Sequence, residues 1–380
     1  LVAPGYGNLA GVPLGLANPY FARMASSPNV TVLEDAATQN ASFFIISEIA
    51  GNDVLGYATS GGVGVDQTGN FDPTTYGSND ITDPNVFAQV LNTVVETMTV
   101  NGAKGVIGNI PAVTSLPYFT AVPYNALDPS NPAFGPLIPQ LNGLYAGLNQ
   151  AFEIIGVPER SIVFSETEAS PLVINDESIP DLSNSITLIL AGGGLDLPTA
   201  TLLGIQFGQA RPATEADLMV LTSQTVIGAV NEEYFGQLVG QGVPPEQAGQ
   251  LSVGGITLPL QDQWVLLPSE QASIKTATDA YNVSIDAVVA QKGLGFVDSE
   301  ELLEQLSTGG VASDGFILTG DYVTGGAFSL DGIHLNARGY AFLANEFLKA
   351  IDETYGSNFE DAGALVDIGN YPPLYGPILP

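Results

Sequence analysis

The chain of 380 residues contains no cysteine, one histidine and eight lysine and arginine side chains, against 40 aspartates and glutamates. The lack of cysteine excludes disulfides, thiolate metal sites and a cysteine nucleophile. Because only one histidine is present as well, we expect no zinc site, and we predict neither a bound metal ion nor a cofactor. No apolar run is long enough to cross a bilayer, because Gly, Pro, Asp or Asn interrupts each one.

The shortage of basic side chains gives a formal net charge of −32. Such a surface repels nucleic acids and anionic membranes, so we expect no nucleic-acid partner. Solubility alone could explain the charge. A saline or extracellular setting, where counterions screen the self-repulsion, is the interpretation that we favour.

The composition is that of a globular protein with many turns. Hydrophobic residues make up 45% of the chain, which is enough for a core, whereas 44 glycines and 26 prolines indicate many irregular connections. Short apolar runs bounded by turn formers predict strands at residues 42–50, 105–111, 161–165 and 294–297. Apolar residues at helical spacing, with helix start and stop signals, predict helices at residues 86–100, 138–155, 268–291, 300–306 and 336–355.

Alternation of strands and helices is typical of an α/β fold, with a parallel sheet between two layers of helices. We therefore predict a single domain over residues 1–380 that forms a three-layer α/β/α sandwich. Residues 1–30 and the polar segment from Asp53 to Asn85 are expected to be loops. Between residues 166 and 263 the pattern loosens, with one helical piece at 214–221, and we interpret this stretch as an insertion that caps the sheet.

The one histidine lies in the sequence FSLDGIHLNARGY, residues 328–340, three residues after Asp331. On a turn, this spacing lets the aspartate bind Nδ1 of His334 and leaves Nε2 free to take a proton. A lone histidine is more often structural. That alternative is weaker here, because the residue sits in a glycine-flanked loop, and such loops at the carboxyl edge of a parallel sheet often carry chemistry.

A second candidate group is Gly51-Asn52-Asp53, which directly follows the strand predicted to end at Ala50. An asparagine amide at the tip of a strand can donate a hydrogen bond to a developing oxyanion. The similar sequence at residues 77–80 has no strand before it, and we interpret it as a turn.

Together these two groups resemble the SGNH, or GDSL-like, lipase and acylhydrolase family, and within it the bacterial branch with long Gly/Asp-rich loops. The segments GNDVLGYATSGG, GAKGVIGNIP and FSLDGIHLNARGY carry the resemblance. It implies a flavodoxin-like fold in which Asp331 and His334 are triad partners of a serine nucleophile. It also implies that Asn52 is an oxyanion donor and that Gly51 contacts the substrate.

The resemblance further implies a serine ester hydrolase that acts on small-molecule, lipid or carbohydrate esters. Proteins of this branch are often exported or lipid-anchored, so an extracellular, periplasmic or outer-membrane-anchored location is expected. Membrane association would come only through a lipid anchor upstream. The alternative is a non-catalytic surface or binding domain on the same fold.

Two features depart from the family pattern. Ala50 stands where the family has glycine, a change expected to cost little. More seriously, neither Gly-Asp-Ser nor Gly-x-Ser-x-Gly occurs anywhere in the chain. We expect that the sequence starts downstream of the first strand and that the serine lies outside it. Natural inactivity is the alternative.

Two further features have plainer explanations. Asp66, Asp72, Asp80 and Asp83 could bind Ca²⁺ through oxygen ligands, but their spacing does not fit an EF-hand, and Asx turns explain them as well. Trp264 could line a substrate groove, although we favour a role in plugging the insertion against the sheet.

Overall fold

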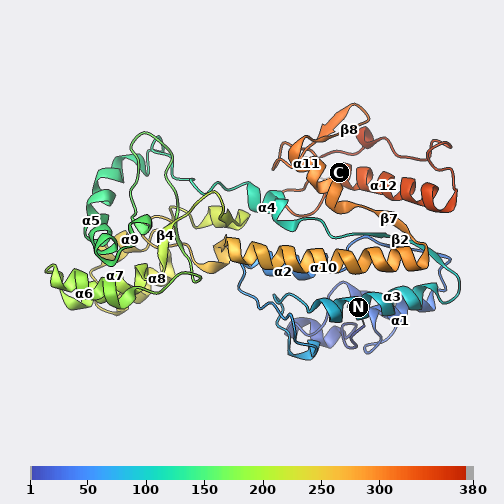
Figure 1. Cartoon of the computed structure of the whole chain (residues 1–380), viewed down its shortest axis with the longest axis horizontal. Coiled ribbons are helices and arrows are strands. Elements are labelled where there is room, and N and C mark those ends of the chain that lie inside the picture. Colours follow the sequence, from blue (N-terminus) through green and yellow to red (C-terminus); the bar gives the residue numbers. More distant parts are fainter. Residues whose placement is uncertain (1, 374–380) are drawn as a thin grey trace.

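The structure is a computed structural model that describes residues 2–373. The molecule is elongated and has two lobes, one built around a parallel sheet and one formed by a long insertion (Figure 1). Each lobe has its own large hydrophobic core, and the core of the insertion lobe extends from Val122 to Leu267.

The sheet consists of three parallel strands in the order β1 (Phe43–Ile46), β2 (Lys104–Gly108) and β7 (Gly295–Val297). In the register, Val106 of the central strand is opposite Ile45 on one side and Gly295 on the other. The fold is therefore mixed α/β with a small parallel sheet, in agreement with the predicted class.

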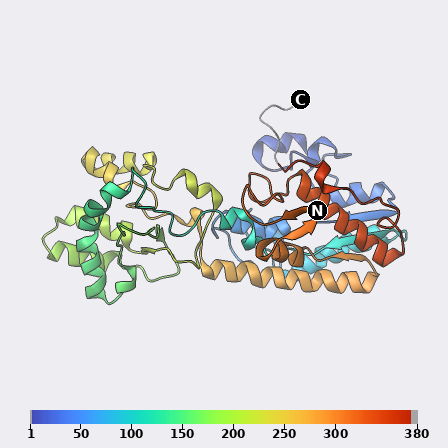
Figure 2. The same cartoon turned by 90° about the horizontal axis from the view of Figure 1, so that it is seen from above.

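Helices pack on both faces of this sheet. On one face, Ile107 of β2 joins a core with side chains of α3 (Pro84–Thr99) and α10 (Pro268–Lys292). On the other face, Val106 packs with residues of α12 (Ala337–Tyr355). This burial on both faces explains why the strands read as continuous apolar runs. Figure 2 shows α10 running along one side of the lobe.

Shorter elements complete the sheet lobe. These are the helices α1 (Val32–Thr38), α2 (Gly51–Thr59), α4 (Pro117–Thr120) and α11 (Ser299–Thr308), the hairpin β8 (Val311–Ser313) with β9 (Phe316–Leu318), and 3₁₀ turns at Leu9–Leu14, Phe21–Arg23, Pro73–Thr75, Val113–Ser115 and Ile368–Asn370.

The insertion lobe holds five helices and two small antiparallel pairs. They are α5 (Ile138–Ile155), α6 (Ser183–Gly192), α7 (Leu197–Phe207), α8 (Glu232–Gly240) and α9 (Pro245–Leu251), with β3 (Val173–Asn175) paired to β4 (Ala210–Pro212) and β5 (Leu218–Met219) paired to β6 (Val265–Leu266), and with 3₁₀ turns at Gly135–Leu137, Pro158–Arg160, Leu221–Thr225 and Asp262–Trp264.

The predicted start of the insertion, residue 166, was too late. The helix expected at 138–155 is present as α5, but its buried side chains Tyr145, Leu148 and Phe152 belong to the insertion core. It therefore does not cover the sheet. A helical pattern reveals that one face is buried but does not reveal which core buries it.

The strand predicted at residues 161–165 is absent. This segment is extended, but its backbone pairs with asparagine side chains of α5 in place of a neighbouring strand. Asn149 accepts from the N–H of Ile162 and donates to its carbonyl, both at 2.8 Å, and Asn142 binds both backbone groups of Phe164 at 2.9 Å. The helix predicted at 214–221 was also wrong, since the segment contains β5.

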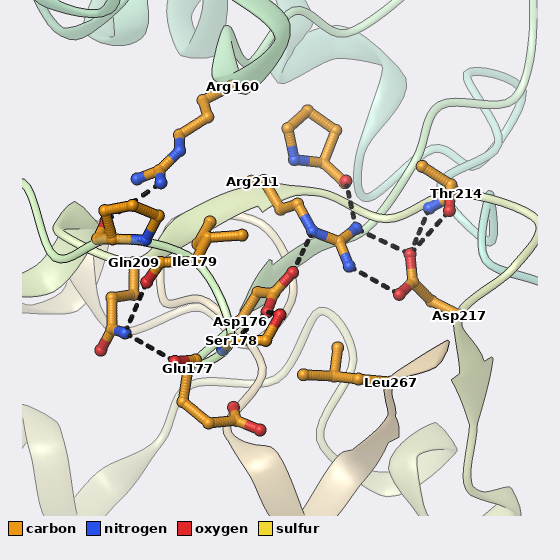
Figure 3. Close-up of polar contacts among 12 residues, drawn as sticks. Arg160, Asp176, Glu177, Ser178, Ile179, Gln209, Arg211, Thr214, Asp217 and Leu267 are labelled. Atoms are coloured by element: carbon orange, nitrogen blue, oxygen red, sulfur yellow. Dashed lines mark hydrogen bonds and ion pairs between the residues drawn. The ribbon is translucent and has the colours of Figure 1, made fainter. Parts of the chain in front are cut away.

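The interior of the insertion lobe is held by a network around Arg211, drawn in Figure 3. Its guanidinium binds Asp176 at 2.6 Å and both carboxylate oxygens of Asp217 at 2.7 Å. Both aspartates are buried. A bidentate pair of this kind is strong because two parallel charge-assisted hydrogen bonds form. The buried Arg160 also donates to the carbonyls of Gly208 and Pro180, so two of the eight lysine and arginine side chains are used to fold this lobe.

The two lobes meet at a cluster of three carboxylates from Glu177, Asp262 and Glu270, whose ligand atoms lie within 4.8 Å of one another. Burial, together with the neighbouring carboxylates, raises the pKa of Glu270 from 4.5 to about 8 and that of Asp262 from 3.8 to about 6. Trp264 packs against both cores beside this cluster, as expected for a plug.

This cluster predicts a stability that falls as the pH rises. The folded protein binds more protons than the unfolded chain between pH 4.5 and about pH 8, the two pKa values of Glu270. Above pH 6 the contribution of Asp262 is already lost. We expect Glu270→Gln to flatten the curve of unfolding free energy against pH between about pH 6 and 8, as measured by urea denaturation.

Glutamine at this position can still accept the hydrogen bond that the N–H of Leu267 donates to Glu270. The matched control is Glu232→Gln, which changes an exposed glutamate in the first turn of α8. If both variants keep the slope of the unaltered protein, the carboxylate of Glu270 is not neutral in the folded state.

Candidate functional site

The loop that carries the histidine is closed by backbone hydrogen bonds. Phe328 and Leu335 form an antiparallel bridge, and the N–H of Ser329 donates to the carbonyl of His334 at 2.8 Å. Asn336, the N-cap of α12, donates to the carbonyls of Gly326 and Phe328 and accepts from the N–H of Gly339. The loop is thereby fixed to the start of α12.

Within this loop, His334 Nδ1 lies 2.8 Å from Asp331 Oδ2, the contact that the three-residue spacing predicts. The other oxygen, Oδ1, accepts from Ser329 Oγ at 2.7 Å and from the N–H groups of Ile333 and His334 at 2.9 Å. Burial opposes ionisation of Asp331, but these hydrogen bonds outweigh it and lower its pKa to about 2. The aspartate is thus a fixed anion that orients the imidazole.

Asn52 lies in the first turn of α2, not at the end of a strand as predicted, because β1 stops at Ile46 and α2 begins at Gly51. The helix forms where a loop was expected because Val54, Tyr57 and Ala58 bury one face of it. Gly51, Asn52 and His334 nevertheless line the same cavity, of about 160 Å³. The structure therefore brings all the candidate residues to one place.

The neighbouring aspartate has a structural role. Asp53 accepts hydrogen bonds from both the N–H and the hydroxyl of Thr82, at 2.8 and 2.7 Å. The hydroxyl of the buried Tyr281 also donates to it at 2.7 Å. Asp53 thus fixes α2 against α10, while its neighbour Asn52 is exposed at the cavity.

Sequence reasoning missed two asparagines that hold the end of β2. Asn282 of α10 accepts from the N–H of Ile110 and donates to its carbonyl, both at 2.9 Å. Asn109 donates to Asp298 and accepts from the N–H of Glu300, which joins β2 to the start of α11. Asn109 lies inside the segment 105–111 that was predicted as a strand, whereas β2 ends at Gly108, so the one available signal was a polar side chain within an apolar run.

Most of the cavity wall is apolar. The aliphatic and aromatic lining residues are Leu55, Ile110, Pro111, Val113, Leu116, Leu302, Leu303, Leu306, Phe328, Ile333, Leu335, Phe342 and Leu343. A small polar cluster at an apolar pocket is the usual composition of a small-molecule site.

The insertion does not cover this cavity as predicted, since none of the lining residues lies between 166 and 263. The insertion lobe stands beside the sheet lobe (Figure 1). The insertion lobe approaches the histidine loop at Gly332, where an added Cβ would lie 3.3 Å from Leu221. The carbonyl of Gly332 also accepts from the N–H of Tyr118 in α4.

Two serines, Ser47 and Ser299, line the cavity. Within residues 2–373, however, no serine or threonine hydroxyl forms a hydrogen bond with the imidazole of His334. Among the described residues, the cavity therefore holds an imidazole oriented by an aspartate, with no serine or threonine hydroxyl bound to it.

Other candidate sites are explained by local contacts. Asp66, Asp72, Asp80 and Asp83 bind N–H and side-chain groups of their own loop, as Asx turns do. In the part of the chain that the structure describes, the only group with metal-ligand spacing is the junction cluster of Glu177, Asp262 and Glu270. No helix among those residues is long and apolar enough to span a bilayer.

Comparison with known proteins identified no relative of this chain. No protein-family model matches the chain, and neither a curated protein nor a solved structure matches it. The resemblance to the SGNH family therefore stays a prediction based on the residues quoted above.

The backbone at Ala50 is strained, although its sequence context gave no sign of it. Ala50 adopts φ 61° and ψ 0°, the left-handed conformation, at the N-cap of α2. This conformation costs a residue with a Cβ about 1–2 kcal/mol, whereas glycine adopts it freely. A glycine at this position would be unstrained.

We expect Ala50→Gly to raise the free energy of unfolding by about 0.5–1 kcal/mol, after the larger conformational entropy of glycine in the unfolded chain is subtracted. Ala272→Gly, at an exposed position within α10, should instead lower it by about 1 kcal/mol. Urea denaturation measures both. If Ala50→Gly lowers the free energy of unfolding as much as Ala272→Gly does, the left-handed conformation of Ala50 is not strained.

Proposed function

We propose that the sheet lobe is the acid–base and oxyanion half of a serine ester hydrolase of the SGNH type. The observation that carries the proposal is the 2.8 Å contact between Asp331 and His334 at the rim of the cavity that Asn52 also lines. A histidine oriented through Nδ1 by a buried or fixed carboxylate is the general base of serine hydrolysis.

In the proposed reaction, the serine hydroxyl attacks the ester carbonyl while Nε2 of His334 takes its proton. The tetrahedral oxyanion then accepts hydrogen bonds from the side-chain amide of Asn52 and from the free N–H groups in the first turn of α2, including that of Gly51. His334 next donates its proton to the leaving alkoxide. Water, activated by the same imidazole, hydrolyses the acyl-enzyme.

The open edge of β1 supports a nucleophile supplied by a further segment. β1 pairs with β2 on one side, and no other strand that the structure describes pairs with its second edge. Ile45 at this edge is 56% exposed, which is unusual for a strand of a parallel sheet. We propose that a parallel strand carrying Gly-Asp-Ser pairs here and completes a flavodoxin-like sandwich.

The apolar wall of the cavity supports an acyl or other apolar ester as the substrate, and the surface charge supports an extracellular or cell-surface location. The alternative function is a binding domain that keeps the fold without catalysis. A binding domain of this kind would have the same sheet lobe but would lack the nucleophilic serine.

The experiment compares this chain with a longer protein that extends upstream of Leu1. The chain alone should hydrolyse p-nitrophenyl butyrate no faster than free imidazole does at equal concentration. The longer protein should be active, and His334→Ala should lower its kcat about 10³-fold or more, because the base is lost. Asn52→Ala should cost about 10²–10³-fold, as removal of one oxyanion donor does.

Ser47→Ala and Ser299→Ala in the longer protein are the controls, and both should keep full activity. Turnover by the chain alone that is lost in Ser47→Ala would place the nucleophile directly after β1 and contradict the proposal. A longer protein that contains Gly-Asp-Ser but lacks activity would favour the binding domain.

A further inference from the structure

The insertion lobe contains a cavity of about 620 Å³ between α5, the α6–α7 hairpin and α9. It lies at the end of the molecule opposite α12, whose start holds the histidine loop (Figure 1). Its size falls in the usual range of small-molecule sites, about 300–1,000 Å³. Nothing in the proposed chemistry at His334 uses it.

No side chain with a formal charge lines this cavity. The wall is mainly aliphatic and aromatic, with Leu148, Leu190, Leu203 and Phe207 from three different helices. The polar lining groups are neutral: the amides of Gln150, Gln247 and Gln250, the hydroxyl of Thr199, and the hydroxyl of Tyr145, which already donates to the carbonyl of Ile256. Free amides can bind a hydroxyl or an ester oxygen without any charge.

The α6–α7 hairpin beside the cavity carries little charge. Residues 183–209, which form the α6–α7 hairpin, contain one ionisable side chain, Asp196, in a protein with a net charge of −32. Three large aliphatic side chains of this hairpin face solvent, with Leu188 exposed by 73%, Leu197 by 61% and Ile205 by 70%. An exposed apolar surface next to an apolar cavity is typical of a binding site and not of a solvated face.

We propose that this cavity binds the alkyl chain of a neutral lipid whose headgroup is an uncharged hydroxyl or ester. The glutamine amides at the wall would bind the headgroup, and the leucines and Phe207 would bury the chain. A fatty acid anion fits poorly, because no cation lines the cavity and the protein as a whole repels negative charge. The inference does not depend on the function of the sheet lobe.

The chain offers a matched pair of glycines for the test, both exposed on α5. Gly147 lines the cavity, and a Cβ there would lie at ordinary contact distance, 3.7 Å, from Leu190. Gly143, one turn earlier, has open space around it and does not line the cavity. Leucine at either position favours the helix by about 1 kcal/mol, so both variants should fold.

The experiment measures binding of decan-1-ol and of decanoate to the full chain by isothermal titration calorimetry. Decan-1-ol should bind, and decanoate about tenfold or more weakly, because the two have the same number of carbon atoms but only decanoate carries a charge. Gly147→Leu should weaken decan-1-ol binding about tenfold or more, since its side chain fills the cavity, whereas Gly143→Leu should stay within about twofold. Circular dichroism checks that both variants are folded.

A diazirine analogue of decan-1-ol provides a readout that needs no variant, since photolysis should label α5, α6, α7 or α9. The proposal is overturned if decan-1-ol does not bind or if decanoate binds equally well. It is also overturned if Gly147→Leu binds as tightly as Gly143→Leu, or if the label maps to the sheet lobe. None of these results bears on the esterase proposal, because neither the binding measurement nor the photolabelling measures hydrolysis.

Discussion

Parallel pairing of β2 with a strand on each side is the constraint on which the candidate site depends. Because β1, β2 and β7 run in the same direction, their carboxyl ends open at one edge of the sheet. Residues that follow these three strands, Ser47, Asn109 and Ser299, therefore line one cavity although they are far apart in the sequence. Side-chain amides then fix the segments that follow the strands, as Asn282 does for Ile110.

The long periodic elements of the fold could be predicted from the sequence. The helices α3, α5, α10, α11 and α12 and the strands β2 and β7 appear within a few residues of their predicted positions. The errors occurred where tertiary contacts replace a local signal. Residues 161–165 have the composition of a strand, but asparagine side chains of α5 form the hydrogen bonds of their backbone. The sequence of the segment itself does not show that its partners are side chains and not a strand.

Local sequence patterns also could not show where the insertion lobe begins. The apolar face of α5 is as periodic as that of α3, yet the two helices pack into different cores. The predicted insertion therefore began at residue 166, where the spacing of apolar residues becomes irregular. In the structure, the chain leaves the sheet lobe earlier, near Val122.

At the site, the contact between Asp331 and His334 was predictable because it is local, since three residues on a turn bring the two side chains together. The convergence of Asn52 with them was predicted from its expected place at the end of a strand and from the family resemblance. The left-handed backbone of Ala50 was not predictable, because alanine does not favour that conformation. Strain of this kind is typical of functional sites.

The central claim is that Asp331 holds His334 with Nδ1 protonated, so that Nε2 is the proton acceptor at the cavity. Nitrogen-15 NMR tests this directly, because the chain contains one histidine and the spectrum therefore reports one imidazole. Under alkaline conditions, where imidazole is neutral, we expect the Nδ1–H tautomer, and Asp331→Ala should shift the population toward Nε2–H, the form that free histidine prefers. An Nε2–H tautomer in the unaltered protein, or no change in Asp331→Ala, would contradict it.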